Sequence, residues 1–256
     1  MEQHYMGIDV GSTATKAVVI DDAKNIVATK LCPTGFSGID AAQRVADSYA
    51  QDGINVADIP VAATGYGRVS VPFADHVITE ITCHGRGAAA LFGADGIVID
   101  VGGQDTKIIQ VCNGSVKKFA MNDKCAAGTG KFLEVMANRM GVSQQNLSEL
   151  ARQGAPTTIS CTCTVFAESE VISLIGQGCN RADIAQGVIE SVVVRVVSLA
   201  AQVPGSPYFL TGGLCENEYI VERLSAHLHQ PVTTLPQARY AGALGAALCA
   251  RDRSKR

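Results

Sequence analysis

Residues 6–20 read MGIDVGSTATKAVVI, and residues 96–109 read GIVIDVGGQDTKII. The two stretches align without a gap, with Asp9 matching Asp100 at an offset of 91 residues and six identities in register. In each stretch an apolar run leads into a turn of small residues and a second apolar run follows, which predicts two strands joined by a tight turn. Such a repeat indicates an internal duplication, so we expect two related halves.

Both repeats continue in the same way. Each is followed by a predicted third strand, near residues 26–31 and 116–121, and by a predicted helix, near residues 39–49 and 128–139. Alternating strands and helices are typical of an α/β fold. Further strands are expected at 61–64, 76–80, 207–213 and 232–234, and further helices at 83–91, 167–175, 182–201, 218–228 and 238–250. Residues 251–256 are expected to form a solvated, frayed end.

The composition excludes several classes of protein. With 47% hydrophobic and 18% charged residues, the 256-residue chain has enough apolar material for a sizeable core in one or two domains, so disorder is excluded. The formal net charge of −3 argues against nucleic-acid binding. No apolar run reaches the ~20 residues that cross a bilayer, and no secretory signal is visible, so we expect no membrane partner and a cytoplasmic location.

The turns between the paired strands have features of phosphate sites. A turn of small residues lets backbone N–H groups approach an anion closely, and each turn follows an aspartate, Asp9 or Asp100, that ends an apolar strand. Two such carboxylates suit Mg²⁺, which prefers oxygen ligands. Neither turn matches GxxxxGK[ST] or GxGxxG. A single turn would be interpreted as an ordinary hairpin with a capping aspartate, but the duplication favours a nucleotide site.

The chain has nine cysteines, an odd number that cannot all pair within one chain. A disulfide framework is a poor explanation in a reducing cytosol, and most of these thiols are expected to be buried. Cys125 and Cys163 each stand just before a predicted helix, whose N-terminal dipole favours a thiolate and an anionic metal cluster. Two ligands per chain suffice if two chains share one cluster. Buried thiols and a zinc site remain alternatives at this point.

The two Asp-x-Gly turns, together with Thr211-Gly212-Gly213, resemble the actin, Hsp70 and sugar-kinase superfamily. The resemblance implies a duplicated actin-like ATPase, with two ribonuclease H-like βββαβα halves and a nucleotide cleft between them. The first half is expected to comprise residues 1–92 plus 238–256. The second half, residues 93–237, carries the cysteine motifs.

Three segments resemble a narrower family: IDVGGQD (residues 99–105), NDKCAAGTG (122–130) and CTVFAESE (163–170). They are similar to the activators of 2-hydroxyacyl-CoA dehydratases, the ATP-binding subunits of benzoyl-CoA reductases and the reductases of double-cubane-cluster proteins. The resemblance implies an oxygen-sensitive homodimer with ATP or ADP, Mg²⁺ and one [4Fe-4S] cluster shared by two subunits. Such an ATPase transfers a low-potential electron to a partner iron–sulfur dehydratase or reductase and receives it from a donor such as ferredoxin or flavodoxin.

The residues that match these motifs define the expected site. Cys125 and Cys163 are the expected cluster ligands, although Cys161 is close enough in sequence to replace Cys163. The residues expected to hold Mg²⁺ and act in hydrolysis are Asp9, Asp100, Gln104 and Asp105. The residues expected to contact the nucleotide are Gly11, Ser12, Thr13, Lys16, Gly102, Gly103, Gly128, Thr129, Gly130, Gly212 and Gly213.

Two other classes of function share this fold. A small-molecule, sugar-type kinase would bind the same nucleotide without a metal cluster, and a nucleotide sensor would bind it without turnover. The segment TEITCHG (79–85) contains Glu80, Cys83 and His84, to which we assign no chemistry beyond packing or domain contact.

Overall fold

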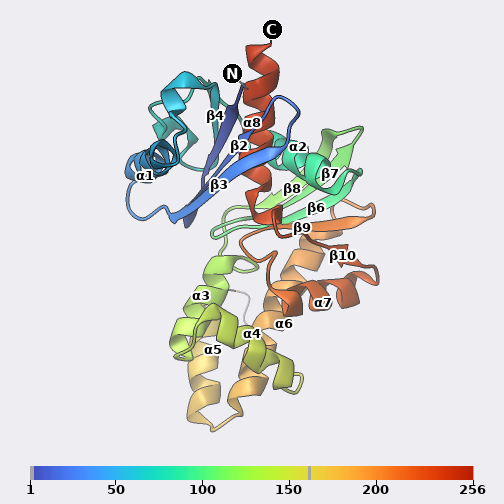
Figure 1. Cartoon of the computed structure of the whole chain (residues 1–256). Helices are drawn as coiled ribbons and strands as arrows, with labels where there is room; N and C mark the ends of the chain where they lie inside the picture. Colours follow the sequence, from blue (N-terminus) through green and yellow to red (C-terminus); the bar gives the residue numbers. More distant parts are fainter. Residues whose placement is uncertain (1–2, 161–162, 256) are drawn as a thin grey trace. The chain divides into compact units, whose positions relative to one another are not determined.

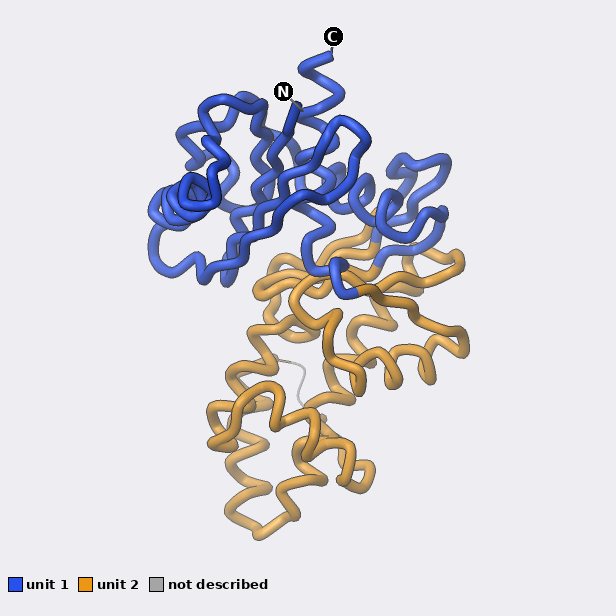
Figure 2. Tube along the Cα trace, in the orientation of Figure 1, with its two compact units in different colours: residues 1–98, 109–118, 236–256 blue, residues 99–108, 119–235 orange. Residues whose placement is uncertain are grey.

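The computed structural model describes residues 3–160 and 163–255. The chain divides into two compact units (Figure 2). Unit 1 contains residues 1–98, 109–118 and 236–256, and unit 2 contains residues 99–108 and 119–235.

The sheet of unit 1 runs in the order β3-β2-β1-β4-β5. β1 is antiparallel to β2, and β2 to β3, whereas β1 and β4 are parallel and β4 and β5 are parallel. The strands are β1 (Tyr5–Val10), β2 (Ala14–Ile20), β3 (Ile26–Pro33), β4 (Val61–Thr64) and β5 (His76–Val77). The expected strand at 76–80 is therefore shorter than predicted, because α2 begins at Glu80.

Helices cover both faces of this sheet (Figure 1). Side chains alternate along a strand, so Met6, Ile8 and Val10 pack with α1 (Gly38–Gln51) on one face. Tyr5 packs with α8 (Ala241–Ser254) on the other face. Gly7 lies on the α8 side, where a Cβ would stand 1.9 Å from the carbonyl oxygen of Ala243, so only glycine allows the helix to approach this strand so closely.

The second sheet has the order β10-β9-β6-β7-β8. Read from the other edge, β8-β7-β6-β9-β10 corresponds strand by strand to β3-β2-β1-β4-β5 of the first sheet. The strands are β6 (Gly96–Val101), β7 (Thr106–Cys112), β8 (Ser115–Asn122), β9 (Tyr208–Gly212) and β10 (Val232–Thr233). β6, β7 and β8 continue from one unit into the other. In the unit 1 part of these strands, Val98, Ile109 and Val111 pack with α2 (Glu80–Phe92). The repeated order agrees with the predicted duplication.

Helices of unit 2 follow the second sheet. They are α3 (Gly130–Arg139), α4 (Gln144–Gln153), α5 (Thr164–Gly176), α6 (Arg181–Ala200) and α7 (Glu218–Leu228). As expected, Asn180 caps α6 by accepting a hydrogen bond from the backbone N–H of Ala182. α4 was not predicted. It is polar overall, but it has an N-cap at Ser143 and buries Leu147 and Ala151, one turn apart.

Short 3₁₀ helices complete the secondary structure at η1 (Val56–Asp58), η2 (Arg68–Ser70) and η3 (Ala238–Tyr240). The frayed end predicted from residue 251 onward is wrong for most of its length, because α8 continues to Ser254. Arg251 donates to the carbonyl oxygen of Asp22 at 2.8 and 3.0 Å, and Asp252 pairs with Arg86. Within residues 3–160 and 163–255, no helix is long and apolar enough to span a membrane.

Candidate functional site

Asp9 forms the first half-site, in unit 1. It lies near the end of β1 with only 3% of its surface exposed, and no hydrogen bond to a described residue reaches Oδ1. Oδ2 lies 3.9 Å from Nζ of Lys16 and 3.9 Å from Nε2 of His84. A buried carboxylate oxygen needs a partner, and a hard cation such as Mg²⁺ suits this one.

Two glycines make room for this carboxylate. A Cβ at Gly65 would lie 2.4 Å from Oδ1 of Asp9, and a Cβ at Gly242 would lie 2.8 Å from Oδ2. Gly65 also has a φ of +91°, which other residues rarely adopt. Gly11, Ser12 and Thr13 follow β1 in a turn that is exposed or half-buried. The turn is therefore open to a ligand while the aspartate behind it is fixed.

Asp100 forms the second half-site, in unit 2, and it is 2% exposed at the end of β6. Thr211 donates its hydroxyl to Oδ1 of Asp100 at 2.9 Å. Nζ of Lys107 lies 3.4 Å from Oδ2 of Asp100 and 2.8 Å from Oδ2 of Asp105. Two buried carboxylates thus share one ammonium group, which leaves an excess of negative charge that fits a divalent cation.

Lys107 and Thr211 were missed as site residues. Lys107 matches Lys16 in the repeat, and Thr211 begins the Thr-Gly-Gly motif, so both carried a signal in the sequence. The two lysines differ in the structure. The side chain of Lys107 is 2% exposed and that of Lys16 is 14% exposed. Gln104 is exposed on the turn that precedes the buried Asp105.

The glycine segments of unit 2 meet at the turn after β6. The backbone N–H of Gly130 donates to the carbonyl oxygen of Gly102 at 2.9 Å, and the N–H of Lys131 donates to that of Gly103 at 2.8 Å. The N–H and hydroxyl of Thr129 both donate to the carbonyl oxygen of Ala126. The N–H groups of Gly130 and Lys131 therefore attach the start of α3 to the turn.

The diglycine motif approaches the same aspartate. A Cβ at Gly212 would lie 2.5 Å from the carbonyl oxygen of Val101 and 2.8 Å from Oδ1 of Asp100, and its φ is +84°. The N–H of Gly213 donates to Val101 at 3.1 Å. Gly213 is exposed, and a Cβ there would meet no atom within 4 Å, so its backbone offers an open surface to a flat ligand group.

Cys125 is exposed in the segment between β8 and α3. Nδ2 of Asn122 donates to the carbonyl oxygens of Cys125 and Ala127 at 2.8 and 2.9 Å, which fixes the fold of this segment. Thr106 donates to the carbonyl oxygen of Gly128 at 2.6 Å. Cys125, Gly128, Thr106 and the α6 residue Arg195 line a pocket of about 180 Å³.

Cys163 is exposed at the N-cap of α5, so the expected position before a helix is confirmed. Cys161 lies outside the described residues. The carboxylate of Glu170 accepts from the N–H and hydroxyl of Ser160 at 3.0 and 2.8 Å and so holds the preceding segment. Over residues 3–160 and 163–255, the potential metal ligands do not form groups of three or more.

The expectation that most cysteines are buried is wrong for the described part of the chain. Cys83, Cys215 and Cys249 are buried and Cys32 is half-buried. The exposed cysteines are Cys112, Cys125, Cys163 and Cys179. Because free cysteine ordinarily packs as a small apolar residue, exposure sets these four apart.

The repeated strand order and the buried aspartates of the two Asp-x-Gly turns define an actin-like ATPase fold, as predicted. A ROK-family glucokinase from Streptomyces griseus, solved with glucose and AMPPNP, has the same fold, with a TM-score of 0.62 at 15% identity. Residues 6–250 match the BadF/BadG/BcrA/BcrD ATPase family, and the chain belongs to this family.

Relatives within the family span the whole chain. The (R)-2-hydroxyglutaryl-CoA dehydratase activating ATPase of Acidaminococcus fermentans is 43% identical and covers 98% of both chains. The crystal structure of component A of that organism's dehydratase has a TM-score of 0.94, with 99% of this chain and 100% of that chain covered. The activator of the 2-hydroxyisocaproyl-CoA dehydratase from Clostridium difficile, solved with bound ADPNP, is 38% identical with a TM-score of 0.91, covering 100% and 96% of the two chains. The resemblance to the dehydratase activators is confirmed.

Proposed function

We propose that this chain is an ATP-dependent activator that hydrolyses Mg-ATP and passes a low-potential electron to a partner iron–sulfur enzyme. The partner is a 2-hydroxyacyl-CoA dehydratase, a related reductase or a double-cubane-cluster protein, and the electron comes from a donor such as ferredoxin or flavodoxin. The observation that carries the proposal is a single segment, residues 122–131, that is hydrogen-bonded to the Asp100 turn and also bears Cys125.

The two half-sites supply the groups that phosphoryl transfer needs, namely fixed charges and a positioned water. Asp9 and Asp100 are the proposed Mg²⁺ ligands, because both are buried at strand ends and Oδ1 of Asp9 accepts no hydrogen bond from a described residue. Lys16 is the proposed phosphate contact. Lys107 forms an ion pair with Asp105, and Gln104, exposed on the same turn, is the residue proposed to orient the attacking water. Gly212 and Gly213 present backbone to the adenosine.

Cys125 and Cys163 fit a shared [4Fe-4S] cluster. Both are exposed thiols before helices of unit 2, and two chains would supply the four thiolates that such a cluster takes. When bound, the cluster supplies one-electron transfer at low potential. Asn122 keeps the segment of Cys125 in place through its hydrogen bonds, and Arg195 lines the same pocket as Cys125.

Two observations support a homodimer: the count of two cluster ligands per chain, and the apolar surface of α5 next to Cys163. α5 begins directly after Cys163 and exposes Val165 (67%) and Phe166 (65%), followed by Ile172 (46%) and Ile175 (45%). Apolar groups in this number on one helix are typical of an interface. We propose that a second copy of the chain covers them.

A structural change caused by ATP hydrolysis would be transmitted to Cys125 through hydrogen bonds within this chain. Any shift of the turn at Gly102 and Gly103 acts on the start of α3 through the bonds from Gly130 and Lys131. The α3 N-terminus carries a partial positive charge, so its displacement changes the field at the neighbouring cysteine. The link is short: Gly128, whose φ of +82° suits glycine, lies three residues after Cys125.

The experiment is anaerobic reconstitution with iron and sulfide. We expect four iron atoms per dimer and a brown chromophore that air bleaches. Cys125→Ser and Cys163→Ser should lose iron while retaining nucleotide binding, whereas Cys179→Ser, which removes an exposed thiol that carries no cluster motif, should retain both. A colourless protein, or iron retained in both of the first two variants, contradicts the electron-transfer half of the proposal. A colourless protein that phosphorylates a small molecule would instead support the kinase alternative.

A further inference from the structure

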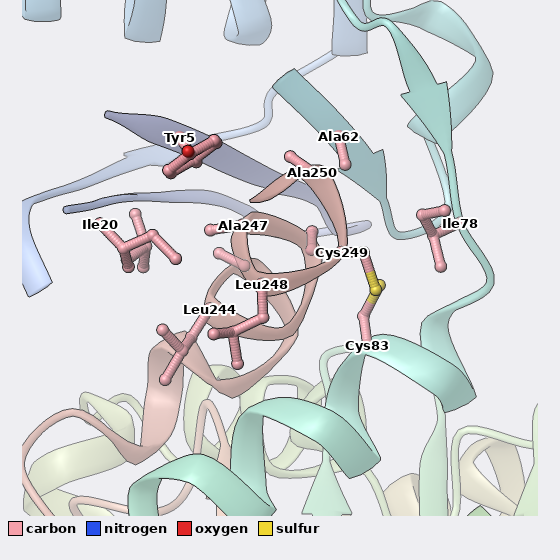
Figure 3. Close-up of a cluster of buried hydrophobic side chains, with 13 residues drawn as sticks. Tyr5, Ile20, Ala62, Ile78, Cys83, Leu244, Ala247, Leu248, Cys249 and Ala250 are labelled. Carbon is pink, nitrogen blue, oxygen red and sulfur yellow. The ribbon is translucent and has the colours of Figure 1, made fainter. Parts of the chain in front are cut away.

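Unit 1 contains two thiols that the proposed activity does not use. Cys83 on α2 and Cys249 on α8 belong to one buried cluster, and their sulfur atoms meet (Figure 3). The two helices touch through their backbones, because a Cβ at Gly245 would lie 1.8 Å from the carbonyl oxygen of Cys83. Cys249 lies one turn after Gly245, on the same face of α8. Close helix contact therefore fixes one thiol opposite the other.

Arg86 adds a charge to this pair. Its Nη1 donates to Sγ of Cys249 at 3.2 Å, and its Nη2 pairs with Asp252. Arg86 follows Cys83 by three residues, so both lie on the face of α2 that meets α8. The hydrogen bond from Cys83, followed by the charge of Arg86, lowers the pKa of Cys249, while the same contact and burial raise the pKa of Cys83. Of the two thiols, Cys249 is therefore the more readily deprotonated.

We propose that Cys83 and Cys249 form a redox-active dithiol, which a peroxide converts into a disulfide that links α2 to α8. The Cys249 thiolate attacks one peroxide oxygen, the O–O bond breaks, and a sulfenic acid and hydroxide form. The Cys83 sulfur then attacks Sγ of Cys249, and the hydroxyl group leaves with the Cys83 proton as water. Two thiols are oxidised, and one hydrogen peroxide is reduced to two waters. A dithiol reductant reverses the change.

Burial favours this product over further oxidation. Cys249 is 5% exposed and Cys83 is fully buried, so the first thiol accepts a small oxidant and the second is already in contact to resolve it. The side chain of Arg86 is 33% exposed and connects the pair to solvent. Cys112 and Cys179 are exposed, so they serve as matched thiols for direct oxidation.

The test treats the anaerobically purified protein with hydrogen peroxide, blocks free thiols, digests the chain and identifies the peptides by mass spectrometry. We expect a peptide pair joined through Cys83 and Cys249 that dithiothreitol releases, while Cys112 and Cys179 yield sulfenic or sulfinic acid. Arg86→Gln should slow formation of the link about tenfold near neutral pH, because the thiolate fraction falls, and Arg86→Lys should restore part of the rate.

Two results would overturn the proposal. One is oxidation of Cys112 and Cys179 with Cys83 and Cys249 still reduced. The other is a link that forms at the same rate in Arg86→Gln. Because Cys249→Ser removes a buried thiol and could reduce folding, Cys83→Ser serves as a second variant: its hydroxyl can still donate to Cys249, and it should yield Cys249 sulfinic acid in place of the disulfide. An unmodified Cys249 in that variant also counts against the mechanism.

Discussion

Replacing Lys107 by methionine tests the charge balance of the Asp100 half-site. Methionine keeps most of the side-chain volume but leaves the carboxylates of Asp100 and Asp105 buried without their shared ammonium, which lies 3.4 and 2.8 Å from them. Loss of one member of a buried ion pair costs about 3–5 kcal/mol. At 1.4 kcal/mol per factor of ten, the folding equilibrium should fall by roughly two to three and a half orders of magnitude.

The assay is urea denaturation followed by circular dichroism, with hydrogen exchange of β6 and β7 to localise the loss. A second variant separates charge from packing. Lys107→Met combined with Asp105→Asn removes one charge of each sign, so it should recover most of the lost stability. A cost of less than about 1 kcal/mol for Lys107→Met, or a double variant no more stable than the single one, would refute the reasoning.

Three further changes test other parts of the structure. Asp9→Asn should abolish Mg-dependent ATP turnover without lowering the melting temperature, and turnover near that of the unmodified protein would exclude Asp9 as a metal ligand. Burial raises the pKa of Glu190, but hydrogen bonds from Arg223 and His227 outweigh burial and leave the pKa below its ordinary value. The ionised Glu190 therefore stabilises the folded state above pH ~4.5, and this stabilisation is lost as the pH falls further. In thermal denaturation, Glu190→Gln should cost ~1 kcal/mol at pH 7 and little at pH 3. Gly7→Ala should destabilise by ~3 kcal/mol or more, because its Cβ would overlap Ala243, whereas Gly176→Ala, which meets no atom within 4 Å, should be neutral or slightly stabilising.

The sequence predicted the fold well where pattern and repeat agree. Both meanders, the buried strand at 61–64 and the capped helix after Asn180 were predicted, because burial imposes regular spacing on apolar residues. α4 and the end of α8 were missed for opposite reasons. α4 is polar except for one narrow stripe, and the charged end of α8 is ordered by ion pairs with residues far away in the sequence, such as Asp22 and Arg86.

Site residues were predictable from motifs only where the motif itself supplies the group. Asp9 and Asp100 stand at strand ends that the repeat marks. The ammonium of Lys107, the hydroxyl of Thr211 and the pairing of Cys83 with Cys249 depend on contacts between distant segments. The repeat marks Lys107 and the Thr-Gly-Gly motif includes Thr211, but no local pattern encodes the contacts themselves, because they arise only when helices and strands pack.

The duplicated lysines have diverged in a way that divides their roles. The position that matches Asp105 in the first repeat is Ala14, so among the described residues the ammonium of Lys16 pairs with one carboxylate, that of Asp9 at 3.9 Å. Lys107 is fixed between two carboxylates, 2% exposed, beside a turn whose carbonyl oxygens hold α3. Lys16, which is partly exposed, can extend toward a phosphate, whereas Lys107 is held in place by its two buried ion pairs. This difference supports our proposal that the first repeat binds the nucleotide, and that the second, which joins its turn to the segment that bears Cys125, transmits the effect of ATP hydrolysis.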